Sequence, residues 1–113
     1  MQQLNTWGHK TIFSYEGNVS TGTTITYGRG AGSASSTPFT VLVTAAQYTA
    51  LLAHFKGSLV AVGSSREPKS GSLEHWLQDH VTPTAVASYV APILVHERKA
   101  VRVAGDDALI QFP

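Results

Sequence analysis

Apolar residues recur at helical spacing in two neighbouring segments near the end of the chain. The first segment begins at Ser72, a residue type that caps helix N-termini, and runs to Val81. In the second segment, Thr82 is the expected cap, Pro83 is the expected first helical residue, and the apolar spacing continues to Leu94. The pattern predicts two helices joined by a short turn.

A β-hairpin is predicted directly after the second helix. Residues 99–103 and 108–112 each have the composition of a short strand. The residues between them include Gly105 and two aspartates, which favour a reverse turn. The C-terminal third of the chain therefore has the predicted order helix, turn, helix, hairpin.

The N-terminal part of the chain is rich in β-branched and aromatic residues, which favour strands. Residues 9–15, 23–27 and 39–43 each predict one strand, and the first two are expected to pair in antiparallel fashion. The aromatic residues of this part are expected to form core, because a small sheet depends on them for stability. The alternative is an exposed platform that stacks nucleic-acid bases. These residues are Trp7, Phe13, Tyr15 and Tyr27.

A helix with clear start and stop signals follows the third predicted strand. Thr44 and Gln47 form the S/T-x-x-E/Q capping box, and Gly57 marks the end of the helix. Leu59 opens a short strand that is expected to be buried. Polar residues 63–71 then lead to the first of the two C-terminal helices.

Residues 28–38 are rich in glycine and serine and are expected to form a flexible loop. An alternative is a phosphate cradle, in which glycine amides surround an anion and Arg29 supplies the positive charge. The spacing differs from GxxxxGK[ST], and a strand follows where a phosphate loop needs a helix. A ligand-binding role for residues 28–36 is therefore a minor alternative.

Composition limits the classes of protein to consider. The 113 residues suffice for one domain with a single core, and the hydrophobic content of 42% is ordinary. Charged residues make up 13%, about half the usual share. A surface so poor in charge is easier to bury, which favours a homo-oligomer. The net charge of +1 provides no overall basic field to attract nucleic acid or a membrane.

The sequence predicts a soluble protein of the cytoplasm. It has no cysteine, so disulfides and cysteine–metal sites are excluded. The N-terminus lacks an apolar signal-peptide core, and no apolar run approaches the roughly 18 residues of a membrane helix. No association with membranes is expected.

No catalytic motif is present, and we expect a non-enzymatic protein without metal or cofactor. Asp79 and His80 could form a hydrolytic triad with a serine of residues 33–36, but the G-x-S-x-G pattern is absent. His75 and His80 are five residues apart, which places them on different faces of a helix. Scattered surface histidines are the favoured interpretation. The histidines are His9, His54, His75, His80 and His96.

Together these elements predict an α+β fold in one domain, residues 1–113. A small antiparallel sheet at residues 9–43 precedes a unit at residues 44–112. The order of elements in this unit resembles the winged-helix branch of the helix-turn-helix DNA-binding proteins. The resemblance rests on that order, on the short turn at residues 80–83 and on the hairpin after the third helix.

This resemblance implies a small regulator that binds duplex DNA. In such families the helix after the turn enters the major groove and the hairpin contacts the DNA backbone or the minor groove. By position, Thr82, Thr84 and Ser88 would face the groove. Arg29, Lys99 and Arg102 would assist them.

The charge distribution supports a second hypothesis. From Lys56 onward there are six basic and six acidic residues, and the would-be recognition helix has no Arg, Lys, Asn or Gln before Arg98. One side of that helix is small and weakly apolar, at Ala87, Ala91 and Val95. The alternative function is therefore a protein-interaction or oligomerisation module that does not bind DNA.

Overall fold

The computed structural model describes residues 2–8, 11–27, 39–63 and 70–113. The segment predicted to be a glycine-rich loop, which contains Arg29, lies outside the described residues. Within them the chain forms two antiparallel sheets and three helices, so the fold belongs to the α+β class. The predicted fold class is confirmed.

The first sheet has four strands, and all neighbours in it are antiparallel. It contains, in spatial order, β1 (Gln2–Asn5), β2 (Ile12–Asn18), β3 (Gly22–Tyr27) and β4 (Phe39–Thr44). The three predicted strands are present, although β2 starts at Ile12 and ends at Asn18, three residues beyond the predicted end. The additional strand, β1, gives no signal in the sequence because Leu4 is its single apolar residue.

Helix α1 (Ala45–Phe55) starts where the sequence predicts. The Thr44 Oγ1 accepts a hydrogen bond from Gln47 N at 3.1 Å, and the Gln47 Oε1 accepts one from Thr44 N at 2.9 Å. This reciprocal pair satisfies two amides that the first turn would otherwise leave unbonded. Tyr48, Leu51 and Phe55 form the buried face of the helix.

The C-terminal part forms two helices and a second, three-stranded sheet. The elements are β5 (Leu59–Ala61), α2 (Leu73–His80), α3 (Ala87–His96), β6 (Val101–Val103) and β7 (Asp106–Gln111). Strand β7 lies in the middle, so the spatial order is β5-β7-β6. The predicted hairpin is therefore present, and β5, the short strand after α1, is the third strand of the sheet.

The start of α3 differs from the prediction. The helix begins at Ala87, four residues after Pro83, and Thr82 does not cap it. The cap comes instead from α2, a contact that no local pattern encodes. Pro92 lies inside α3 without ending it, because the helix continues to His96.

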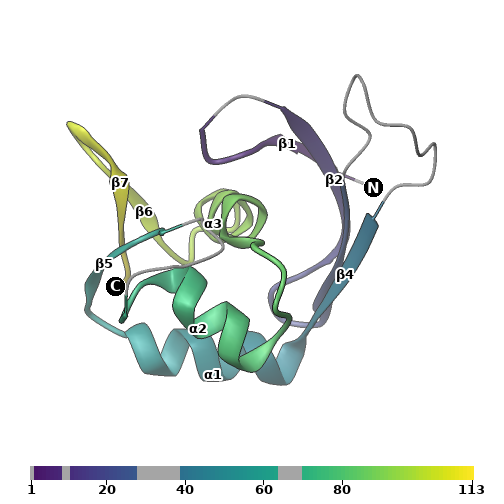
Figure 1. The fold of residues 1–113 in the computed structure, drawn as a ribbon, viewed down its shortest axis with the longest axis horizontal. Helices are drawn as coiled ribbons and strands as arrows, with labels where there is room; N and C mark the ends of the chain where they lie inside the picture. The colour runs from purple at the N-terminus through teal and green to yellow at the C-terminus, as the bar shows by residue number, and fades with distance from the viewer. Residues whose placement is uncertain (1, 9–10, 28–38, 64–69) are drawn as a thin grey trace.

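Helix α3 occupies the centre of the molecule, between the two sheets, and α1 and α2 pack beneath it (Figure 1). One hydrophobic core joins residues of the N-terminal strands to residues of all three helices and of the second sheet. The aromatic residues Trp7, Phe13 and Tyr15 are part of this core, as predicted. The four-stranded sheet thus covers the helix that the winged-helix resemblance assigns to DNA.

Candidate functional site

A buried carboxylate caps the N-terminus of α3. Val86, which precedes the helix, supplies no side-chain cap. Glu74 of α2 is fully buried, and its Oε1 accepts a hydrogen bond from Ala87 N at 2.9 Å. A negative charge there also suits the positive end of the helix dipole. Pattern reasoning cannot find this contact, because it joins residues 13 positions apart through tertiary packing.

Burial raises the pKa of Glu74 above its usual value. Hydrogen bonds from the backbone of Ala87 and Val86 and from the side chain of Gln78 act in the opposite direction, because they favour the charged form. Desolvation has the larger effect. The cap of α3 is therefore a titratable group whose charged form is disfavoured by its surroundings.

Pro92 frees a backbone acceptor in the middle of α3. Proline has no N–H, so it cannot donate to the carbonyl of Ser88 one turn earlier. That carbonyl instead accepts a hydrogen bond from Trp7 N at 2.9 Å. The segment between β1 and β2 is thereby tied to the helix at the place where the helix lacks its own bond.

Arg102 of β6 contacts the same tryptophan through its side chain. Its guanidinium carbon lies 3.9 Å from the centre of the Trp7 ring, which is cation–π geometry. One guanidinium nitrogen also donates to the carbonyl of Trp7 at 3.3 Å. Arg102 therefore joins the second sheet to the N-terminal segment, and this use of its donors limits what it can offer a phosphate.

Aromatic packing fixes α3 against the inner side of the four-stranded sheet. The ring of Tyr89 stacks on Tyr27, with centroids 4.4 Å apart, and meets Phe13 edge-on at 5.3 Å. Burial raises the pKa of both tyrosines. These contacts hold the Tyr89 side of α3 against β2 and β3.

The C-terminal end of α3 is tied to the same sheet by a carboxylate. Glu97 accepts a hydrogen bond from the hydroxyl of Tyr15 at 3.0 Å through one oxygen and from Val19 N at 2.9 Å through the other. Burial, followed by the hydrogen bond to Glu97, raises the pKa of Tyr15 to about 12. Helix α3 is thus anchored at its start, its middle and its end.

The residues proposed for DNA binding lie at both ends of α3 and within it. Thr82 and Thr84 lie before α3, where the hydroxyl of Thr82 accepts a hydrogen bond from Thr84 N at 3.4 Å. Ser88 is half-buried beneath the Trp7 segment, and Lys99 lies beyond the far end of the helix. A ten-residue helix separates the two ends by about 15 Å. Arg29 lies outside the described residues.

The expected exposed face at Ala87, Ala91 and Val95 is not available in the folded chain. Ala87 and Ala91 are fully buried, and Val95 is half-buried against the core. This expectation is wrong because both alanines belong to the core that is shared by the strands and the three helices. The helical pattern alone could not show which element would cover that side.

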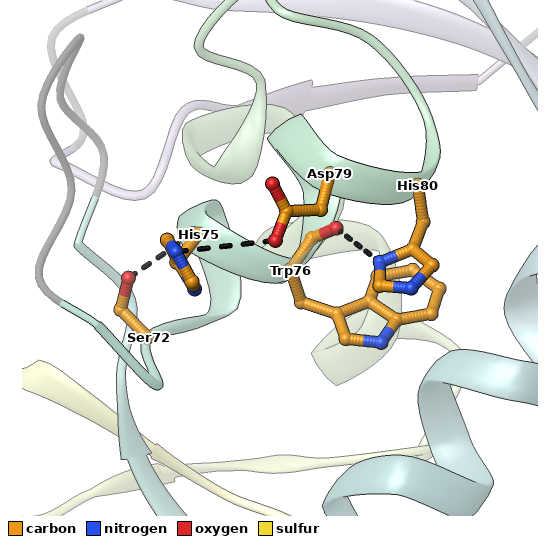
Figure 2. Close-up of polar contacts among 5 residues, drawn as sticks. All are labelled: Ser72, His75, Trp76, Asp79 and His80. Carbon is orange, nitrogen blue, oxygen red and sulfur yellow. Dashed lines mark hydrogen bonds and ion pairs between the residues drawn. The ribbon is translucent and has the colours of Figure 1, made fainter.

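On α2, Asp79 and His80 do not pair with each other (Figure 2), and the serines considered with them, residues 33–36, lie outside the described part of the chain. Asp79 approaches Nε2 of His75 at 3.9 Å, not His80, and both partners are largely exposed. His80 stacks on the ring of Trp76, and its Nδ1 lies 2.9 Å from the Trp76 carbonyl oxygen. Across the part of the chain that the structure describes, no group of three or more His, Cys, Asp or Glu residues is placed to hold a metal ion.

An uncharged row of side chains lies on the outer side of the second sheet. In the strand register Leu59 of β5 and Val101 of β6 flank Gln111 of β7. Leu59 is 52% exposed and Val101 is 56% exposed. The amide nitrogen of Gln111 donates to backbone carbonyls of its own sheet, at Ser58 and Phe112.

Two more apolar residues extend this row. Ala61 pairs with Leu109 in the register, and both are half-buried. We call the resulting surface the outer face, which comprises Leu59, Ala61, Val101, Leu109 and Gln111. Because alternate residues of a strand point to opposite sides, Ile110 between them is fully buried in the core. The outer face offers apolar contact area without chemistry of its own.

Comparisons of the chain with protein-family models, with curated proteins and with solved structures found no match. Among the residues that the structure describes, no helix has the length and apolar character needed to cross a membrane.

Proposed function

We propose that this protein is a small non-enzymatic interaction module that docks another protein through the outer face. The observation that carries the proposal is the row Leu59, Gln111 and Val101, in which two large apolar side chains are more than half exposed. Contiguous exposed apolar surface on a small protein marks contact sites. Because the side-chain amide nitrogen of Gln111 already donates to carbonyls of its own chain, burying this row costs less free energy.

The occupant that we propose is a second copy of the same chain. A two-fold dimer brings the same patch of both subunits together, so the patch must be compatible with itself. A face made only of uncharged side chains meets this condition, because it brings no like charges together. The low charged content of 13% and the net charge of +1 act in the same direction.

The test is the mass of the protein in solution, measured by light scattering and sedimentation over a range of concentrations. We expect a dimer for the wild type and a monomer for Leu59→Glu and for Val101→Glu, because each places two like charges in the interface. Leu42→Glu is the matched control, since Leu42 is 58% exposed on the four-stranded sheet. The control variant should still form the dimer.

A wild type that remains monomeric at millimolar concentration would contradict self-association. Dimers that persist in both outer-face variants would show that another surface is used. If the wild type is monomeric alone but retains a different protein in a pull-down that Leu59→Glu abolishes, the face is correct and the occupant is wrong.

Nucleic-acid binding is the competing proposal, and the order of elements supports it. From α1 the chain runs helix, strand, helix, helix, strand, strand, with the last strand in the middle of its sheet. The coverage of α3 by the four-stranded sheet and the use of Arg102 by Trp7 weigh against it. We therefore expect no salt-dependent binding of duplex or single-stranded DNA in fluorescence anisotropy at low salt. Binding that is lost in Thr84→Glu would favour the competing proposal.

A further inference from the structure

A pocket of about 440 Å³ lies where α1, α3 and the end of the second sheet meet. Its volume falls in the range of small-molecule sites. Leu52 and Ala53 of α1 and Phe112 after β7 provide apolar walls, and Pro113 lies at one side. The ring of Phe112 is held in place by stacking on Phe55, with centroids 5.2 Å apart. The walls are thus anchored in the core.

Three cationic side chains line this pocket, which we call the basic pocket. They are Lys56, Arg98 and Lys99. No lining side chain is acidic, and in the described part of the chain none of the three forms an ion pair. Of the four lysines and arginines that the structure describes, the fourth is Arg102, which is held by Trp7. The described basic residues with unengaged charges are therefore concentrated at one site.

The ends of α1 and α3 explain part of this concentration. Both helices end beside the pocket, at Phe55 and His96, and cations are favourable near helix C-termini. Each helix end carries a partial negative charge of about one half, however, whereas each side chain carries a full positive charge. The pocket therefore keeps a positive excess.

The backbone at Arg98 is a second, independent observation. Arg98 has φ of 63°, and it is the single non-glycine residue with positive φ among those described. Its N–H donates to the carbonyl of Val95, and Lys99 N donates to the carbonyl of Leu94, which is the Schellman pattern that ends helices. Glycine fills this position without strain. Here a residue with a strained backbone lines the pocket, and such strain gathers at functional sites.

We infer that the basic pocket binds a small organic anion, a molecule with a carboxylate, sulfonate or phosphate on an aromatic or aliphatic body. The anionic group lies among Lys56, Arg98 and Lys99, and the body packs against Leu52 and Ala53, which are not fully buried. Arg98 contributes charge-assisted hydrogen bonds, which are stronger than those between neutral groups. This inference is independent of the proposed dimer, because it uses none of the residues of the outer face.

The experiment uses the full chain and three probes followed by two-dimensional amide NMR. The probes are anilinonaphthalene sulfonate, its neutral analogue phenylnaphthylamine, and inorganic pyrophosphate. We expect the sulfonate to shift the amides of Lys56, Lys99 and Phe112. Each of the other two probes should bind at least tenfold more weakly, since one lacks the charge and the other lacks the apolar body.

Arg98→Gly separates binding from folding. The variant removes the strain at positive φ, so its melting temperature should rise by about 3 °C. Its affinity for the sulfonate should nevertheless fall about tenfold, the effect of losing one charged hydrogen bond. Gln3→Glu is the matched control, because it changes the net charge equally at an exposed position on β1. The control should keep the wild-type affinity.

Three results would overturn the inference. The first is an Arg98→Gly variant that binds the sulfonate as tightly as the wild type. The second is a set of shifted amides that lies away from the pocket. The third is equal affinity for the sulfonate and for the neutral probe, which would show a merely apolar site. Tight binding of pyrophosphate would overturn the part of the inference that concerns the apolar body.

Discussion

At the scale of single residues, three charged side chains hold distant parts of the fold together. Glu74 caps α3, Glu97 bonds Tyr15 and Val19, and Arg102 holds Trp7. Each contact joins segments that are far apart in the sequence or separated by a loop. Because only 13% of the residues are charged, few charged side chains are left to bind partners. The three in the basic pocket are therefore notable.

Glu74 makes the stability of the protein depend on pH in a direction opposite to that of most carboxylates. Above the usual pKa of a glutamate the unfolded chain loses this proton while the folded chain retains it, because burial raises the pKa of Glu74. The folded state then binds more protons, so this group lowers the free energy of unfolding as the pH rises from the usual value to the raised one. Glu74→Gln does not titrate. As the pH rises from the usual pKa of a glutamate to the raised pKa of Glu74, the free energy of unfolding of the variant should therefore increase relative to that of the wild type.

The measurement for Glu74 is urea unfolding of both proteins between pH 4 and pH 8, each step compared at the same ionic strength. Glu16→Gln, at an exposed position of β2, controls for the removal of one negative charge. A difference between wild type and Glu74→Gln that stays constant over this range would contradict the assigned titration.

At the scale of elements, the sequence predicts which segments become helices and strands, but not how they cover one another. The box Thr44–Gln47, the stripe of α2 and the turn at Gly105 are local signals, and each predicted its element. The start of α3 was misplaced because its cap, Glu74, comes from another helix. The exposed interface expected at Ala87 and Ala91 was wrong for a related reason, since amphipathic spacing does not reveal which elements pack around a helix.

The same limit applies to the candidate sites. The outer face follows from the register of β5, β7 and β6, which brings Leu59 beside Gln111 and Val101. The basic pocket combines residues from positions 52 to 113. The alternation in the hairpin and the absence of glycine after His96 are signals that could have indicated them.

Pro92 within α3 provides a test of how the elements are joined. In Pro92→Ala the new N–H competes with Trp7 N for the carbonyl of Ser88, which now accepts only the latter. We expect α3 to remain helical by circular dichroism, whereas the amide of Trp7 should exchange with solvent about fivefold faster in hydrogen-exchange NMR. The amide of Thr6, which bonds the carbonyl of Thr11, serves as the internal reference. Unchanged protection of the Trp7 amide would show that its hydrogen bond to Ser88 does not depend on the absence of an N–H at Pro92.

At the scale of the whole molecule, the N-terminal sheet and the C-terminal unit share one core. Trp7 is buried at one end of this core beside Arg102, and Trp76 is buried on α2 near Phe55 and His54. A C-terminal unit without the sheet would expose Tyr89, which packs on Phe13 and Tyr27. The two parts are therefore expected to depend on each other for stability.

The two tryptophans allow this dependence to be measured directly. Trp7→Phe leaves a reporter in the C-terminal unit, and Trp76→Phe leaves one in the N-terminal segment. In each variant we expect the urea midpoint from tryptophan fluorescence to equal the midpoint from far-ultraviolet circular dichroism, because one shared core unfolds in a single transition. If the Trp7 signal is lost at a lower urea concentration than the circular dichroism signal, the sheet detaches from α3 before the helices unfold. That result would show that the groove-facing side of α3 can be uncovered, and it would strengthen the nucleic-acid proposal over the interaction module.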